Sequence, residues 1–439
     1  MEASSVHECL DQWIIADGLP LVVDLHKSYA SYLHDAKTGK DYLDFFGFMA
    51  SRPLAFNHPG LKTPEFLERL QAAAVHKPSN GDIYSVEYAE FIDTFGRVAL
   101  ESQFRHLFFI EGGAAAVENA VKAAFDWKHR KNIEAGNGEK GSQVIHFAGC
   151  FHGRTGYALS MTDSYDKRKT RYFPRFDWPR ISSPVMRFPF DDAALKDVEA
   201  AEAGALDEIA KAFAANPDDI AAIIIEPIQG EAGDHYFRSD FLKALRSICD
   251  DNEALFILDE VQTGFGSSGR WWDWQNHDCK PDILVFGQKA QVAGIAATAR
   301  LDEVESVFEI PSRISTTFSG NLTDMVRCQR VIEIVVDDGL LDNAAGMGRY
   351  LLRVLVELSF THKELSSIRG RGLWAAFDLP TTAERDKVVQ ACLEEELLLL
   401  AAGRRTVRLR PALDIDADSI GRAGAQLDAG LRRAYGRKV

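Results

Sequence analysis

Short apolar runs alternate with amphipathic stretches through the middle of the chain. The apolar runs are RHLFFI (105–110), QVIHF (143–147), AAIIIEP (221–227), LFILDE (255–260) and ILVF (283–286). Their length and composition predict buried strands, and the stretches between them, such as Ala115–Lys131, 192–215 and Arg238–Asn252, predict helices. Strand–helix alternation over roughly 200 residues indicates an α/β protein with a mainly parallel, doubly wound sheet.

The two ends of the chain have a different pattern, which predicts a smaller α+β unit. Residues 1–20 indicate a short amphipathic helix, and residues 21–45 a small antiparallel sheet. The remaining expected elements are helices at Leu61–Val75, Asn321–Val336, Asn343–Leu358, Thr381–Glu396 and Asp418–Tyr435, and strands at Arg369–Leu379 and Thr406–Leu409. We therefore expect residues 1–45 and 319–439 to form a small domain and residues 46–318 a large one.

Composition narrows the class of protein. The chain has 439 residues, 46% of them hydrophobic, and a net charge of −15. This charge disfavours a nucleic-acid surface, which needs a basic stripe. The six cysteines form no CxxC pair and no metal-ligand spacing, so we expect reduced thiols, no metal and a cytoplasmic protein. No signal peptide and no apolar run of about 18 residues is visible, so no membrane span is expected.

Two strand ends carry the residues that suggest chemistry. LFILDE delivers Asp259, and PDILVFG, about thirty residues later, delivers Lys289. The carboxyl ends of strands in an open α/β sheet border the crevice where ligands bind. An amine beside an acid suits Schiff-base catalysis, in which the acid keeps a proton on an electron-withdrawing ring. Taken alone, Lys289 also fits a surface lysine, but its place after an apolar strand favours burial and a lowered pKa.

Other motifs have both a functional and a structural interpretation. Gly112–Lys122 follows a strand and starts with paired glycines. Its backbone N–H groups either face an anion, or the segment is an ordinary tight turn without a ligand. In FHGRT, Phe151 is able to stack on a planar ring and Arg154 to bind a carboxylate; a packing aromatic and a surface arginine are the alternative. Glu231 follows a strand and fits either a site acid or a solvated loop.

One polar segment and two arginines also have two interpretations each. STTFSGN (315–321) offers hydroxyl groups for a phosphate, or is a loop. Arg408 and Arg410 lie on one predicted strand and share a face by its two-residue period, so either is able to bind a carboxylate, or both are surface charges.

LFILDE also resembles the second motif of an ATPase, but no GxxxxGK is present. GFGSSG is followed by a poor helix start, so we interpret it as a turn.

Together these motifs resemble the class III pyridoxal phosphate (PLP)-dependent aminotransferases, and within them the lysine ε-aminotransferase family. The resemblance covers nearly the whole chain. It rests on GGAAAVENAVKAAFDWK, FHGRTGYALSMTDS, IIIEPIQGEAGD, FILDEVQTGFG, PDILVFGQKAQVAG and STTFSGNLTDMVR. It implies fold type I: a mainly parallel seven-stranded sheet with helices on both faces, and a small α+β domain.

The resemblance also implies roles for individual residues. Lys289 would bind PLP and move the proton, and Asp259 would keep the pyridine nitrogen protonated. Val261 and Phe151 would pack on the two ring faces, and Gln262 would bind the ring hydroxyl. Gly113 and Ala114 would bind the phosphate, with Thr317 from the neighbouring subunit of a homodimer that shares its sites. Arg154 would bind a substrate carboxylate, Arg408 or Arg410 the α-carboxylate of the oxo acid, and Glu231 would pair with that arginine or move aside.

The activity implied is ping-pong transfer of the ε-amino group of L-lysine to 2-oxoglutarate, giving 2-aminoadipate 6-semialdehyde and glutamate. The chain departs from the lysine pattern at Gln288, Ala290, Ala293 and Ser319, and RPAL replaces RPPL. None of these changes removes a catalytic group, but they leave other ω-amine donors open: ornithine, GABA or a diamine. An ATP-binding module and a catalytically idle paralogue are the alternatives from other classes.

Overall fold

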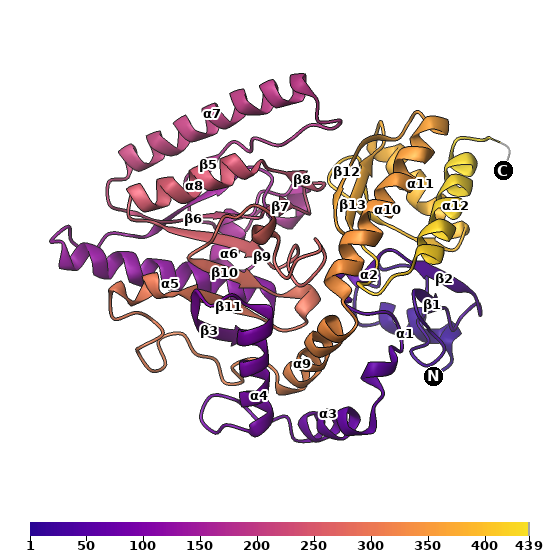
Figure 1. Ribbon diagram of the computed structural model, residues 1–439, viewed down its shortest axis with the longest axis horizontal. Helices are drawn as coiled ribbons and strands as arrows, with labels where there is room; N and C mark the ends of the chain where they lie inside the picture. The colour runs from indigo at the N-terminus through magenta and orange to yellow at the C-terminus, as the bar shows by residue number, and fades with distance from the viewer. Residues whose placement is uncertain (438–439) are drawn as a thin grey trace.

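A seven-stranded sheet forms the centre of the larger part of the protein (Figure 1). The computed structural model describes residues 1–437. The strands, in spatial order, are β3 (Phe104–Ile110), β11 (Ala293–Thr298), β10 (Ile283–Phe286), β9 (Leu255–Glu260), β6 (Ile220–Ile225), β4 (Gln143–Phe147) and β5 (Arg180–Ile181). Only β11 runs antiparallel to its neighbours, so the predicted mainly parallel sheet is confirmed.

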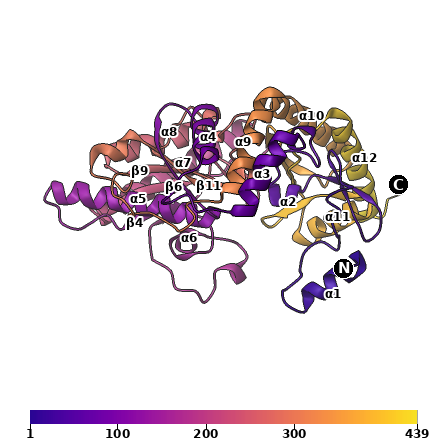
Figure 2. The ribbon, with the colours of Figure 1, turned by 90° about the horizontal axis from the view of Figure 1, so that it is seen from below.

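Helices cover both faces of this sheet (Figure 2). One face carries α5 (Gly113–Glu134) and α6 (Gly156–Met161), and the other carries α4 (Val86–Thr94), α7 (Asp192–Ala215) and α8 (Ser239–Asp251). The strand β9 shows why both faces are covered. Leu255 and Ile257 pack into the cluster under α5, whereas Phe256 and Leu258 pack into the cluster on the opposite side. A strand buried on both sides is uniformly apolar, as its sequence is.

A four-stranded antiparallel sheet lies in the smaller part, on the right of Figure 1. Its order is β12 (Ser366–Arg371), β13 (Trp374–Asp378), β16 (Thr406–Leu409) and β15 (Leu400–Ala402). The helices α10 (Leu340–Thr361), α11 (Thr382–Glu394) and α12 (Ala417–Ala434) pack around it. The single strand predicted at Arg369–Leu379 is wrong. Gly372, with φ of +56°, turns that segment into a hairpin of β12 and β13.

The two ends of the chain meet in a second small sheet. The strands β1 (Tyr32–His34) and β2 (Asp41–Asp44) form a hairpin, and β14 (Leu397–Leu398) pairs in parallel with β2. The N-terminal helix α1 (Val6–Asp11) is shorter than predicted. The remaining elements are α2 (Gly47–Ala50), α3 (Pro64–His76), α9 (Leu322–Asp337), β7 (Ile228–Gln229) and β8 (His235–Tyr236). The domain boundaries at residues 45 and 318 stay a prediction. Within residues 1–437, no helix combines the length and apolarity needed to cross a membrane.

Candidate active site

Lys289 is a buried amine at the carboxyl end of the central sheet. β10 runs parallel to β9 with Val285 opposite Asp259, and the chain then forms the short 3-10 turn Gln288–Ala290. The Lys289 side chain is 2% exposed, and its Nζ donates a hydrogen bond to the carbonyl oxygen of Arg52 at 2.9 Å. Burial, together with the charges of Arg410 and Arg52, lowers its pKa to about 7. No carboxylate of residues 1–437 lies within 4.0 Å of Nζ, so a neutral, nucleophilic amine is accessible near pH 7.

Asp259 is held in place from two sides. Its Oδ2 lies 2.7 Å from Nδ1 of His152, and its Oδ1 accepts a hydrogen bond from the backbone N–H of Val261 at 3.0 Å. Although burial opposes charging of His152, its contacts with Cys150 and Asp259 raise its pKa well above the usual value. A cationic imidazole therefore lies in direct contact with the Asp259 carboxyl group. His152 was not among the predicted site residues; its position in FHGRT, directly after β4, was the available signal.

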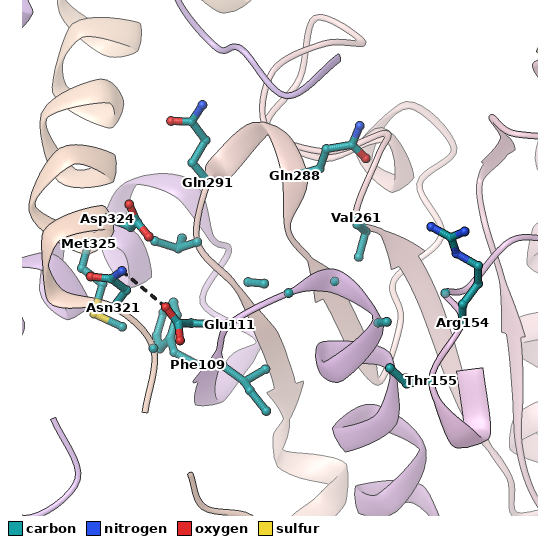
Figure 3. A pocket seen from close by; sticks show the side chains of 18 of the residues that line it. Phe109, Glu111, Arg154, Thr155, Val261, Gln288, Gln291, Asn321, Asp324 and Met325 are labelled. Atoms are coloured by element: carbon teal, nitrogen blue, oxygen red, sulfur yellow. Dashed lines mark hydrogen bonds between the residues drawn. The ribbon is translucent and has the colours of Figure 1, made fainter. Parts of the chain in front are cut away.

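Two cavities that share several lining residues open here: Asp259 lines one of them, and Lys289 lines neither but follows Gln288, which lines both. The smaller one, about 120 Å³, is bordered by Asp259 and Gln262, and the larger one, about 660 Å³, opens outward. Residues that line both are Gly113, Ala114, Phe151, Gly153, Val261 and Gln288. Figure 3 shows the larger cavity, with Arg154 and Thr155 on one side and Asn321 and Asp324 on the other. The sheet thus ends in a recess large enough for a small-molecule ligand.

The N-terminus of α5 borders both cavities. Gly112 precedes the helix with φ of +96°, a conformation that L side chains rarely adopt. At Gly113, an added Cβ would lie 2.7 Å from Cγ1 of Val261, so only glycine fits there without movement. The first N–H groups of a helix have no partner within the helix, and they favour an anion. The paired glycines therefore bring a helix N-terminus close to Val261, next to the cavity.

The two arginines near β16 have different surroundings. The Nη2 of Arg410 donates to both carboxylate oxygens of Asp234, at 2.6 Å each. The Arg410 guanidinium lies 3.7 Å from the ring centroid of Trp374. Arg408 is 4% exposed, and its NH1 donates to Gln262 Oε1 and to the carbonyl oxygen of Gly230. Among residues 1–437, no carboxylate lies within 4.0 Å of Arg408. Arg408 is thus a buried cation beside the smaller cavity, and neither arginine is a surface charge.

The other expected site residues lie at different distances from this centre. Arg154 is exposed at the edge of the larger cavity. Glu231 lines the smaller cavity, where its Oε1 contacts Lys169 and Ser164 and not Arg408. Thr317 is exposed and borders neither cavity.

Glu226 is a second site residue that was not predicted. Its Oε1 accepts the backbone N–H of Phe151 at 2.8 Å and its Oε2 that of Gly230 at 3.3 Å. Burial raises its pKa to about 8. The carboxyl group joins the loop that carries Phe151 to the loop that carries Glu231. Its signal was the acid directly after β6, similar to the pattern that pointed to Asp259 near the end of β9.

Comparison with known proteins agrees with this arrangement. The profile of the family "Aminotransferase class-III" matches residues 15–429. The chain is a class-III aminotransferase. It is 48% identical to the L-lysine-epsilon aminotransferase of Mycobacterium tuberculosis over 430 residues, which cover 97% of this chain and 95% of the relative. It is 44% identical to the L-lysine-epsilon aminotransferase of Streptomyces clavuligerus over 427 residues, which cover 96% and 93%.

Its fold is likewise similar to a solved aminotransferase. The structure of the lysine aminotransferase from M. tuberculosis in the internal aldimine form superposes with a TM-score of 0.96 at 47% identity, covering 99% of this chain and all of that one. The chain therefore has the type I fold of PLP-dependent transferases.

The residues present fit PLP, the cofactor of this family. A buried amine without a carboxylate partner among residues 1–437 suits condensation with the cofactor's aldehyde. The Asp259 carboxyl group, held by His152, suits a protonated ring nitrogen. Val261 and Phe151 line the same cavity as the start of α5, which suits a phosphate. The groups around the recess therefore suit the aldehyde, the ring and the phosphate of the cofactor.

Proposed function

We propose that this aminotransferase moves the ε-amino group of L-lysine to 2-oxoglutarate, giving 2-aminoadipate 6-semialdehyde and glutamate in two half-reactions. The relatives named L-lysine-epsilon aminotransferase, at 44–48% identity over nearly the full chain, support lysine as donor. The observation that carries the proposal is the buried Lys289 with two arginines at different places, Arg154 in the lining of the larger cavity and Arg408 bonded to Gln262 of the smaller one. Two cations at different places suit two carboxylate-bearing substrates.

Lys289 and Asp259 are the proposed catalytic residues. When bound, PLP supplies an aldehyde that condenses with amines and a ring that withdraws electrons from the substrate carbon. Lys289 Nζ binds the cofactor and then carries a proton between the substrate carbon and the cofactor carbon. Asp259, held by His152 and the N–H of Val261, keeps a proton on the ring nitrogen.

The remaining cofactor contacts follow from the lining of the two cavities. Val261 and Phe151 pack on the two faces of the ring, and Gln262 donates to its hydroxyl group. Gly113 and Ala114 donate backbone N–H groups to the phosphate. These contacts would hold the cofactor ring in one orientation for its reaction with Lys289.

The arginines select which end of each substrate reacts. Arg154, at the outer edge, binds the α-carboxylate of the donor, so that the ε-amine of lysine and not its α-amine reaches the reactive carbon. Arg408 binds the α-carboxylate of the oxo acid. Glu231 pairs with Arg408 or leaves it, according to which substrate is bound.

We further propose a homodimer with shared sites, acting in the cytoplasm. Thr317 lies outside both cavities and is exposed, as is Phe318 next to it. In a dimer, the Thr317 hydroxyl would reach the phosphate in the site of the neighbouring subunit. This arrangement gives a role to Thr317, a hydroxyl-bearing residue that borders neither cavity of its own chain.

Initial rates with different donors test the substrate. We expect L-lysine with 2-oxoglutarate to give the highest kcat/KM, because Arg154, in the lining of the larger cavity, suits a donor whose carboxylate is remote from the reacting amine and because the lysine aminotransferases are the relatives at 44–48% identity. L-ornithine, 4-aminobutyrate and a diamine are the comparison donors. A higher kcat/KM for any of them would assign the chain to that ω-aminotransferase activity instead.

A further inference from the structure

Glu231 lies near two cations but contacts only one of them. Its Oε1 accepts hydrogen bonds from Lys169 Nζ at 2.5 Å and from the Ser164 hydroxyl at 2.9 Å. Its Oε2 is buried and has no hydrogen-bond partner among residues 1–437. The other cation is Arg408, whose NH1 donates to the carbonyl oxygen of Gly230, the residue before Glu231. The Arg408 Nε is also buried without a partner in the part of the chain that the structure describes.

Lys169 is presented by a local structure that fixes its position. It ends the 3-10 turn Lys167–Lys169, in which the side chain of Asp166 accepts the N–H of Arg168. The Ser164 hydroxyl accepts the N–H of Asp166 at 3.2 Å and donates to Glu231, so the same loop supplies both contacts to this carboxylate. The Lys169 ammonium also lies 5.7 Å from the ring centroid of Phe151. The side chains of Lys169 and Glu231 are 32% and 17% exposed, so water screens their attraction only in part.

The distribution of charge has a consequence for Arg408. A buried guanidinium without a carboxylate partner is costly, and it gains most from any carboxylate that reaches it. Glu231 and Asp234 are the carboxylates of the adjoining loop, and Asp234 is already paired with Arg410. A substrate carboxylate would therefore compete with Glu231 for the donors of Arg408. Because Lys169 and Ser164 bind the Glu231 carboxylate, Glu231 does not compete with a substrate for Arg408.

We propose that Lys169 is a positioning residue, which holds Glu231 away from Arg408 and so keeps this arginine free for the carboxylate of the oxo acid. The inference rests on the proposed function, because it takes Arg408 as the carboxylate-binding residue. Lys169 acts through Glu231 and does not touch the substrate. Loss of its charge releases Glu231 to pair with Arg408, and a dicarboxylate must then displace Glu231.

Binding of glutarate to the holoenzyme tests this inference. Glutarate has the two carboxylates of 2-oxoglutarate but no oxo group, so calorimetry measures binding without turnover. We expect Lys169→Met to weaken glutarate binding about tenfold, in the usual range for coupled sites. Lys167→Met is the matched control, because Lys167 is on the same turn but pairs with Asp163, with its side chain 65% exposed. We expect this control to bind glutarate as the wild type does.

The double variant Lys169→Met/Glu231→Gln separates positioning from direct contact. A neutral amide at position 231 cannot neutralise Arg408, so we expect the double variant to regain wild-type affinity for glutarate. Steady-state rates give a second readout. Lys169→Met should raise KM for 2-oxoglutarate more than KM for L-lysine, whereas Lys169→Arg, which keeps the charge, should have the wild-type KM for 2-oxoglutarate.

Three results would overturn the inference: unchanged affinity in Lys169→Met, a double variant as weak as the single one, or a wild-type holoenzyme that does not bind glutarate. The proposed donor is tested separately. A wild-type enzyme that binds glutarate but does not react with L-lysine refutes the donor and leaves the test of Lys169 valid.

Discussion

Arg408 and Arg410 are two residues apart, yet the structure predicts opposite effects for their substitution by methionine. Arg410→Met removes the partner of Asp234, a carboxylate with no exposed surface, and leaves a buried uncompensated charge. Breaking such a pair costs about 3–5 kcal/mol. Arg408→Met removes a buried cation that has no carboxylate within 4.0 Å among residues 1–437, so no charge is left unpaired.

These energies translate into measurable shifts. An unfolding entropy of about 2.1 cal/mol/K per residue gives roughly 0.9 kcal/mol/K for 439 residues. A loss of 3–5 kcal/mol in Arg410→Met then lowers the Tm by about 3–5 °C. For Arg408→Met we expect a Tm within about 1 °C of the wild type, or higher. Its effect falls on binding: loss of charged hydrogen bonds worth about 1.5–3 kcal/mol raises KM for 2-oxoglutarate roughly 10- to 150-fold.

Thermal unfolding and steady-state kinetics of the two variants, each loaded with PLP, are the assay. The reasoning predicts a kinetic defect with normal stability in Arg408→Met and reduced stability in Arg410→Met. The reverse result, a destabilised Arg408→Met together with a stable Arg410→Met of raised KM, would refute the assignment of the carboxylate site to Arg408.

Three further predictions concern the cofactor site. Lys289→Ala should abolish turnover, since no other amine replaces its Nζ; retained steady-state activity would rule out its role. PLP uptake by the apoenzyme should accelerate as pH rises through about 7, where Lys289 loses its proton, and then level off; a rate that keeps rising toward pH 10.5 would contradict the lowered pKa. Gly113→Ala should weaken PLP binding about tenfold, because the new Cβ would lie 2.7 Å from Val261 Cγ1. The double variant Gly113→Ala/Val261→Ala should recover the affinity for PLP. Equally weak PLP binding in both variants would count against this steric cause.

The same lowered pKa of Lys289 has a consequence for stability. Between pH about 7 and 10.5, the unfolded chain holds a proton on this amine that the folded chain has lost. The free energy of unfolding of the apoenzyme should therefore rise with pH across this window. Lys289→Met should remove this rise, which denaturant titrations at several pH values would detect.

The central sheet could be predicted because burial on both faces makes its strands continuous apolar runs. β9 and β10 carry this pattern, and their ends place Asp259 and Lys289. β5 has only Arg180 and Ile181, and β11 reads AGIAAT, so neither has a run long enough to be recognised. The hairpin was missed because the apolar run LWAAF begins in the turn itself, at Leu373, so Gly372 alone marks the break between the two strands.

The partners of the site residues could not be derived from sequence. The contact of Lys289 with the carbonyl oxygen of Arg52 joins segments more than two hundred residues apart. Arg408 and Arg410 look alike in VRLRPAL, and only the position of Asp234 distinguishes them. The contact of Lys169 with Glu231 is of the same kind, since a lysine in a polar loop gives no sign of its partner.

The visible absorption spectrum of the PLP-loaded protein, before and after addition of L-lysine without an oxo acid, tests the central claim most directly. Lysine then has only the cofactor to receive its amino group. The account predicts a yellow protein whose band is lost as the amino group is transferred, and whose colour returns on addition of 2-oxoglutarate. A yellow band that L-lysine leaves unchanged would contradict lysine as donor, and a protein that stays colourless with PLP would contradict the whole assignment of the site.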